Sequence, residues 1–188
     1  MCLSTVTKTF YVLIVGLTFI LTIIGLVTPN WRVFHSVNST SDDGHIGLKK
    51  GCHFPPHGVS TTETQCQAWW QDRPKWERDV WALILAALVI EACALIWALS
   101  SYIICCCNKR FCHLLPIWSL VFCALLAAAV GLFAGNKAKD AGMITDDPQY
   151  KGTLKLGYSY FIEVVALLLG IASIIIGAMT SLLSDICC

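Results

Sequence analysis

Four long apolar stretches dominate this sequence and limit the folds that it can adopt. They cover residues 10–28, 80–104, 114–134 and 158–183. About 20 apolar residues in a helix cross the hydrocarbon core of a bilayer, and only helices or closed barrels satisfy their own backbone hydrogen bonds in lipid. We therefore predict four transmembrane helices.

The connections and the composition agree with an integral membrane protein built as one domain over residues 1–188. The predicted connections are residues 29–79, 105–113 and 135–157. The chain is 56% hydrophobic and 13% charged, whereas soluble domains have about 25% charged residues. A net charge of +1 provides no basic face for nucleic acid. We expect membrane lipid, and no nucleic acid, as a partner.

The first long connection has the composition of a small folded unit. Residues 31–37 alternate bulky and polar side chains, residues 45–52 offer a second strand, and turn-forming residues fill 38–44. Cys52 and Cys66 are the cysteines of this connection. A bridge between them would close a loop of about 15 residues and restrict the unfolded chain by about 3 kcal/mol. Two unpaired thiols are the alternative.

Basic residues alone would place the long connections in the cytoplasm. The two ends and the short connection hold Lys8, Lys109 and Arg110, and the long connections hold the other lysines and arginines. The positive-inside rule assigns the more basic side to the cytoplasm. In the first long connection, however, acidic residues balance the bases, and a neutral folded loop is easier to export.

Three features favour the opposite orientation. Asn38 begins an Asn-Ser-Thr glycosylation sequon, which has meaning only on the lumenal side. The pair Cys52 and Cys66 suits an oxidising compartment. Cysteines at the other ends of the predicted helices suit S-palmitoylation in the cytoplasm; the alternative is that cysteine replaces another small apolar residue. These cysteines are Cys105, Cys106, Cys107, Cys112, Cys187 and Cys188. We expect a multi-pass plasma-membrane protein with both termini cytoplasmic and with connections 29–79 and 135–157 extracellular.

Several residues of the first connection follow the pattern of a known family. Trp31 comes just after the first predicted span, Gly47 and Leu48 follow, and Cys52 and Cys66 come next. In a four-span chain with a long first connection, this order resembles the claudin superfamily. That superfamily includes the peripheral myelin protein, the epithelial membrane proteins and the calcium-channel γ subunits.

Two further features extend the resemblance and two depart from it. Arg78 precedes the second span, where the family often has a basic residue, and residues 156–161 resemble the start of the family's fourth helix. Lys49 stands where the family has a tryptophan after Gly-Leu. The two cysteines of the first connection are also more widely spaced than is usual in the family.

The resemblance implies a mainly α membrane fold. In it, a left-handed four-helix bundle carries a small extracellular antiparallel β-sheet, formed mostly by the first connection and joined by the second. It also implies that Trp31 wedges between sheet and bundle. An aromatic belt at the lipid headgroups is the alternative, and for Trp76 and Trp81 the two interpretations fit equally well.

Small residues spaced by four predict close helix contacts within the bundle, because small side chains let helices approach in lipid. They are Ala127, Gly131 and Gly135 in the third span and Ala166, Gly170, Ser173 and Gly177 in the fourth.

Two acidic residues interrupt the apolar stretches. Glu91 lies near the middle of the second span, where an ionised carboxylate would cost several kcal/mol. It is either a protonated, hydrogen-bonded carboxyl that faces the bundle or a residue for coupling, for an ion or for a partner. Glu163 lies about five residues into the fourth span, within reach of water, and with Glu91 it is a candidate for a polar contact inside the membrane.

Motifs for catalysis and for metal binding are missing. The sequence has no nucleophile with a recognisable base, no phosphate-binding glycine loop and no transporter pattern. His45, Cys52, His53 and His57 match no closed zinc site. We therefore expect no enzyme activity, no cofactor and no metal.

Two classes of function remain. The resemblance implies a protein of cell–cell junctions, adhesion or a paracellular barrier, with like molecules in the same and opposite membranes as partners. The alternative is an auxiliary subunit that modulates an ion channel or receptor. Residues 184–188 contain no convincing PDZ-binding motif. The Asp147-Pro148 turn and the length of the second long connection place the junction role first.

Overall fold

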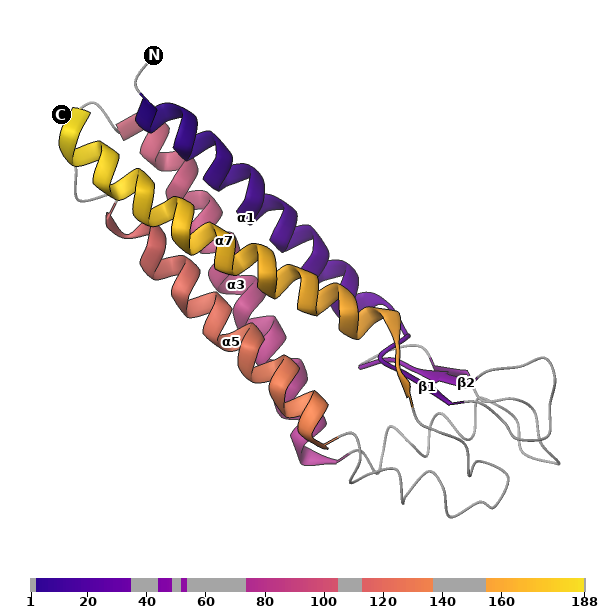
Figure 1. Ribbon diagram of the computed structural model, residues 1–188. Helices are drawn as coiled ribbons and strands as arrows, with labels where there is room; N and C mark the ends of the chain where they lie inside the picture. Colours follow the sequence, from indigo (N-terminus) through magenta and orange to yellow (C-terminus); the bar gives the residue numbers. More distant parts are fainter. Residues whose placement is uncertain are drawn as a thin grey trace, which may run out of the picture.

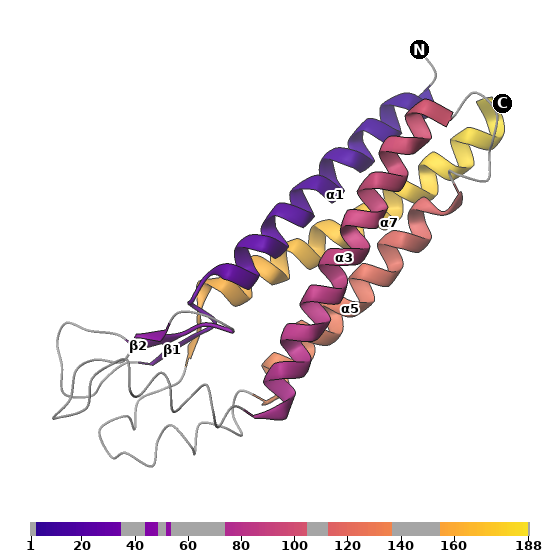
Figure 2. The same ribbon diagram turned by 180° about the vertical axis from the view of Figure 1, so that it is seen from behind.

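Four long helices lie side by side, and short strands gather at one end of them (Figure 1). This computed structural model describes residues 3–34, 44–48, 52–53, 74–104, 113–136 and 155–187. The helices are α1 (Leu3–Val27), α3 (Lys75–Ile104), α5 (Leu115–Asn136) and α7 (Tyr158–Cys187). The beginning of α1 and the end of α7 lie at the end of the bundle opposite the strands, as both views show (Figures 1 and 2).

All four helices are long and apolar enough to cross a membrane, so the predicted four-span membrane fold is confirmed. Helix α3 begins at Lys75, ahead of the apolar stretch that starts at Val80. Its first turn includes Glu77, and an acidic side chain there interacts favourably with the helix N-terminus. The polar first turn therefore extends the helix beyond the apolar stretch.

The buried side of every helix repeats at alternating intervals of three and four residues. In α3 it consists of Glu77, Val80, Ile84, Ala87, Glu91, Ala94, Ala98 and Ser101. In α7 it consists of Ser159, Glu163, Ala166, Gly170, Ser173, Gly177, Thr180 and Ser184. A repeat of about 3.5 residues keeps one face against the neighbouring helices of a left-handed bundle. Small and polar residues dominate these faces, and many large apolar side chains, such as Leu168, point outward.

Each helix packs mainly against two neighbours. Helix α1 contacts α7 and α3, and α5 contacts the same two helices from the opposite side. Close packing of α7 depends on its glycines: a Cβ atom on Gly170 would lie 2.6 Å from Cys123 Sγ, and one on Gly177 would lie 3.2 Å from Tyr11. The predicted contacts of the small residues in the fourth span are thus confirmed.

The corresponding prediction for the third span is wrong. Ala127, Gly131 and Gly135 are exposed, and a Cβ atom on either glycine would meet nothing within 4 Å. The buried face of α5 is formed instead by larger side chains, including Phe122 and Leu126. The small residues of α5 therefore lie on the outer surface of the bundle.

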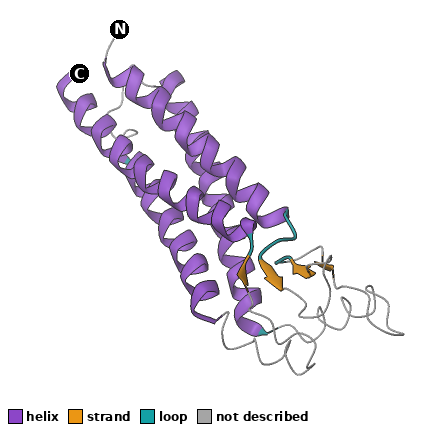
Figure 3. Cartoon of the chain, turned by 45° about the vertical axis from the view of Figure 1, so that its right-hand side comes forward, coloured by secondary structure: helices purple, strands orange, loops and turns teal. Residues whose placement is uncertain are grey.

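A short sheet covers one end of the bundle (Figure 3). Its strands are β1 (Arg32–Phe34), β2 (Gly44–Ile46), β3 (Cys52–His53) and β4 (Lys155–Leu156), in the order β3-β2-β1-β4. Every neighbouring pair is antiparallel. The predicted antiparallel sheet, with a strand from the second long connection, is confirmed. The single strand suggested over residues 45–52 is wrong, because β2 and β3 are separate strands that pair with each other.

Candidate functional site

Trp31 joins the sheet to the bundle at the end of α1. Its indole Nε1–H donates a hydrogen bond to the Gly25 carbonyl over 2.8 Å. In a continuing helix that carbonyl would accept from the residue four positions later, but that residue is Pro29, which has no N–H. The indole therefore satisfies a carbonyl that the helix end leaves without its usual donor.

Aromatic and aliphatic side chains from several elements enclose the Trp31 ring. The ring is 1% exposed, and its centroid lies 4.9 Å from that of Phe133 and 6.4 Å from that of Tyr160, both edge-to-face. Leu48, which is fully buried, belongs to the same cluster, as do Val80, Ile84 and Ala129. We call Trp31, Leu48, Val80, Ile84, Ala129, Phe133 and Tyr160 the anchor cluster. Because it draws on the sheet side and on α3, α5 and α7, it fixes the sheet to the bundle.

A buried charged residue lies beside the anchor cluster. Arg32 is 1% exposed, as is Glu77 at the start of α3. The Arg32 guanidinium lies 5.1 Å from the centre of the Trp76 ring and 5.3 Å from that of Phe133, which permits cation–π attraction. Trp76 therefore contacts a residue of the sheet, which an aromatic belt at the lipid headgroups alone would not require.

Backbone contacts tie the end of α1 to the start of α7. The Gly157 N–H donates to the Trp31 carbonyl over 3.0 Å and the Ser159 N–H to the Asn30 carbonyl over 3.1 Å. The Thr28 hydroxyl donates to the Ser159 hydroxyl over 2.7 Å. A Cβ atom on Gly157 would overlap the Asn30 carbonyl, so only glycine permits this close approach.

Two carboxyl groups lie inside the bundle next to the anchor cluster, on its side away from the sheet. Glu91 and Glu163 are both fully buried. The Thr22 hydroxyl donates a hydrogen bond to Glu91 Oε1 over 3.2 Å, and a Cβ atom on Gly25 would lie 2.5 Å from Glu163 Oε1. Both carboxyl groups therefore pack against the same helix, α1.

The arrangement of a small antiparallel sheet anchored by a tryptophan to four membrane helices agrees with the family pattern seen in the sequence. The sequence pattern of the family described as "Tight junction protein, Claudin-like" matches residues 1–187. The chain belongs to this claudin-like family. A comparison with curated proteins gives no match.

In this claudin-like chain the structure brings part of the family motif together. Trp31, Gly47 and Leu48 are buried at the base of the sheet, where the anchor cluster forms. Arg78 is exposed on the first turn of α3 and lies outside that cluster. Glu163 does not reach water: it is fully buried, and its face of α7 packs against α1 at Gly25. Its role as a polar contact inside the membrane stays a prediction.

Several predicted positions lie outside the described residues. These are Asn38, Lys49, His57, Cys66, Cys105, Cys106, Cys107, Cys112 and Cys188, and the side chains of Cys52 and Cys187 also lie outside the description. The predicted Cys52–Cys66 bridge, the glycan and the acylation therefore stay predictions.

Sequence reasoning missed two residues of the site, Arg32 and Glu77. Both were counted among the balanced charges of the first connection. The signal for Glu77 was its spacing, because it precedes the buried Val80 and Ile84 at intervals of three and four residues. The signal for Arg32 in the sequence was its position directly after Trp31.

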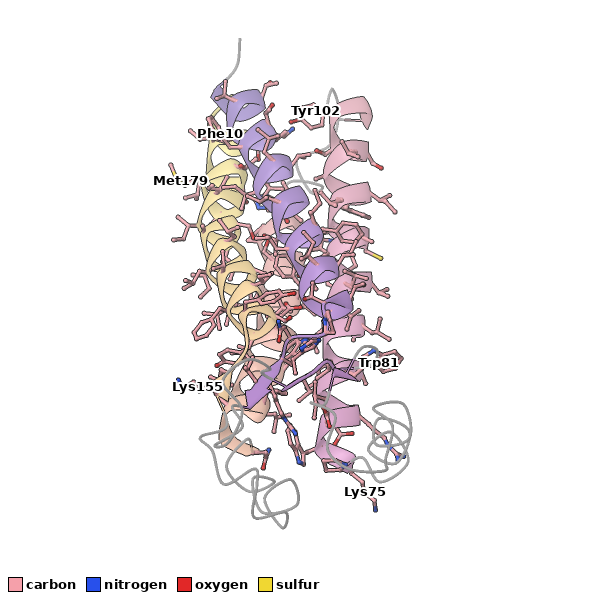
Figure 4. The ribbon with its side chains drawn as sticks, turned by 90° about the vertical axis from the view of Figure 1, so that its right-hand side faces the viewer. Phe10, Lys75, Trp81, Tyr102, Lys155 and Met179 are labelled. Atoms are coloured by element: carbon pink, nitrogen blue, oxygen red, sulfur yellow. The ribbon has the colours of Figure 1, made fainter. Side chains whose placement is uncertain are left out.

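Outward-facing side chains surround this arrangement. Phe10 and Met179 lie on the outside of the bundle near the end opposite the sheet, and Lys75 and Trp81 lie at the sheet end (Figure 4). Phe10 is 55% exposed and Met179 is 51% exposed. A large apolar outer surface of this kind is suited to lipid.

Proposed function

We propose that this claudin-like protein acts at cell–cell junctions, as an adhesion or barrier protein whose sheet side contacts like molecules in the same and opposite membranes. The observation that carries the proposal is the anchor cluster. It fixes the sheet to the membrane helices, so that a contact made by the sheet side is held in a defined orientation. A preorganised surface loses less conformational freedom on binding than a flexible one does.

The proposed orientation places the sheet outside the cell and both termini in the cytoplasm. Asn38, the sequon residue, belongs to the connection between β1 and β2, on the side of the sheet. The cysteine cluster at residues 105–107 follows the end of α3 at Ile104, and that end lies with the chain termini (Figure 1). Glycosylation and acylation then fall on opposite sides, as each modification requires.

The test compares two leucine truncations in a cell line that forms no junction strands of its own. Leu48→Ala removes a fully buried residue of the anchor cluster, whereas Leu168→Ala removes a leucine that is 60% exposed on the outer face of α7. We expect the wild-type chain and Leu168→Ala to concentrate at contacts between expressing cells. We expect Leu48→Ala to reach the cell surface and to lose that enrichment.

Surface biotinylation provides the control for delivery, and barrier resistance across the cell layer is the second readout. An even distribution of the wild-type chain over the plasma membrane, without enrichment at cell contacts, would contradict the junction proposal.

The outer face of α5 supports a second candidate, an auxiliary subunit of a channel or receptor. Ala127, Gly131 and Gly135 are exposed there, and small residues permit close approach of another membrane helix. Gly131→Leu should then release a channel subunit that copurifies in stoichiometric amount from native membranes. Gly16→Leu, at another glycine with open space around its Cβ position, is the matched control.

A further inference from the structure

The carboxyl groups of Glu91 and Glu163 lie in the interior without a basic partner. Neither residue is exposed. Glu91 Oε2 and both carboxyl oxygens of Glu163 have no hydrogen-bond partner within the described part of the chain. Residues 9–27, 80–104, 115–136 and 158–184, which form most of the four helices, contain no lysine, arginine or histidine.

Helix α1 brings the two carboxyl groups to one place. Thr22, which donates to Glu91, and Gly25, which packs against Glu163, are three residues apart on the buried face of α1. Side chains at this spacing are neighbours, with about 5–6 Å between their Cβ positions. The carboxyl groups of α3 and α7 therefore approach α1 within one helical turn of each other.

The other elements around the pair carry little that could balance its charge. From α1, the buried neighbours are Thr18, Thr22 and Gly25, which do not ionise. From α5, the ionisable group facing Glu91 is the Cys123 thiol. Arg32, on the sheet, has its guanidinium over the Trp76 and Phe133 rings.

An ionised pair in this position would be unstable. A single carboxylate within the membrane costs several kcal/mol, and two like charges at close range repel each other in a medium of low dielectric constant. The described residues contain no group of three histidine, cysteine, aspartate or glutamate side chains that could hold a metal ion. Two protons, one on each carboxyl group, neutralise such a pair without further protein groups.

We propose that Glu91 and Glu163 form a proton-binding site inside the bundle, and that its occupancy controls how firmly the sheet is docked. Protons come from water on the sheet side. Ser159 lies four residues before Glu163 on the same face of α7 and contacts Thr28 at the end of α1. Ser159 is thus the polar side chain of α7 that lies one turn nearer the sheet than Glu163.

The route from the pair to the sheet passes through Gly25. Glu163 packs against Gly25, and the Gly25 carbonyl accepts the hydrogen bond of the Trp31 indole. With both carboxyl groups protonated, α1, α3 and α7 pack together and Trp31 keeps its place in the anchor cluster. When both protons leave to water, repulsion between the two carboxylates separates the helices at this level and weakens the packing of Trp31.

The first test detects the proton directly. Infrared spectra of the purified protein in lipid nanodiscs, recorded at neutral pH, should contain the C=O band of protonated buried carboxyl groups. The Glu91→Gln/Glu163→Gln variant should lack it, and Asp79→Asn, which changes an exposed residue of the same helix, should retain it. If the wild-type spectrum contains no such band, the pair is ionised and the proposal is wrong. The wild-type spectrum alone decides this point even if the double variant does not fold.

The second test measures the docking of the sheet. Hydrogen-exchange protection factors, which are corrected for the intrinsic effect of pH, should fall in β1 of the wild-type protein as the pH rises, because the docked state holds both protons. They should stay constant in the double variant, whose amides have no proton to lose in this range. Equal pH dependence in the two proteins would overturn the control of docking. Neither result depends on whether the protein acts at junctions.

Discussion

Single side chains complete the hydrogen bonding of a backbone that is hidden from water. The indole of Trp31 replaces the donor that Pro29 cannot supply to Gly25. Deeper in the bundle, the Tyr11 hydroxyl lies 2.9 Å from the Leu115 carbonyl and 3.0 Å from the Ser119 hydroxyl, to which Ser173 donates over 2.9 Å. Such groups have no alternative partner in lipid, so each of them specifies one packing of its neighbours.

Trp31→Phe isolates the hydrogen bond of the anchor tryptophan. Phenylalanine keeps an aromatic ring in the cluster and leaves the Gly25 carbonyl without the indole donor. The Thr28 hydroxyl remains as a more distant donor to this carbonyl, at 3.4 Å. We expect the free energy of unfolding in detergent or lipid to fall by about 0.5–1.5 kcal/mol, the net contribution of one hydrogen bond. Trp118→Phe, at a half-buried tryptophan of α5 whose ring packs against Trp97, serves as the matched control, and a similar loss in both variants would contradict the role assigned to the indole N–H.

At the level of the helices, the apolar stretches predict where each helix crosses the membrane but not which face it buries. A soluble helix reveals its buried face as an apolar stripe, whereas here both faces are apolar. This is why the exposed small residues Ala127 and Gly131 were mistaken for contacts. Polar residues within the spans indicate the buried face better: Thr22, Glu91 and Glu163 all lie on buried faces.

The sheet was predictable in outline, and its details were not. The alternation near Trp31 and the resemblance to claudins predicted strands and their antiparallel pairing. The division of residues 45–52 into two strands depends on pairing between β2 and β3, which composition does not encode. The burial of Glu163 does not follow from its distance to the helix end, because that distance does not say which face of the helix a residue occupies. The intervals of three and four residues to Ala166 and Gly170 place Glu163 on the same face as these two residues.

The packing of α7 against α5 can be tested with one methyl group. Gly170→Ala would place a Cβ atom 2.6 Å from Cys123 Sγ and 2.8 Å from Phe122, and overpacking of this kind costs about 1–3 kcal/mol of stability. Adding Cys123→Ala should recover part of that loss, because it removes one of the two clashes. Gly16→Ala has open space around it and should leave the unfolding midpoint unchanged or raised. Equal effects at Gly16 and Gly170 would show that helix propensity, and not packing, decides the result.

Taken as a whole, the molecule has two different ends. One end carries the sheet, the anchor cluster and the buried arginine. The other end carries the beginning of α1 and the end of α7 (Figures 1 and 2). The interior between them contains buried hydroxyl groups, among them those of Ser119, Ser173 and Thr180. Because all four helices are long and apolar enough to cross a membrane, the two ends lie on opposite sides of it.

Asn38→Gln tests the orientation. If the sheet end faces the lumen during synthesis, the wild-type chain carries a glycan at this sequon, and the variant should migrate faster on a gel by the mass of that glycan. Asn136→Gln, at the end of α5 and outside any sequon, should migrate like the wild type. A wild-type chain without a glycan, together with cleavage of the first connection by a protease added to the cytosolic side, would reverse the proposed orientation.

The order of the strands in the sheet also has a consequence for biosynthesis. Strand β1 pairs with β2 and with β4, and β4 is synthesised only after α5. At about 5–20 residues per second, the edge of β1 that β4 covers stays open for on the order of ten seconds. Phe133 and Tyr160 reach the anchor cluster in the same late interval. In the proposed orientation, a lumenal chaperone that shields unpaired strand edges would bind the chain during this interval, and synthesis of β4 would end it.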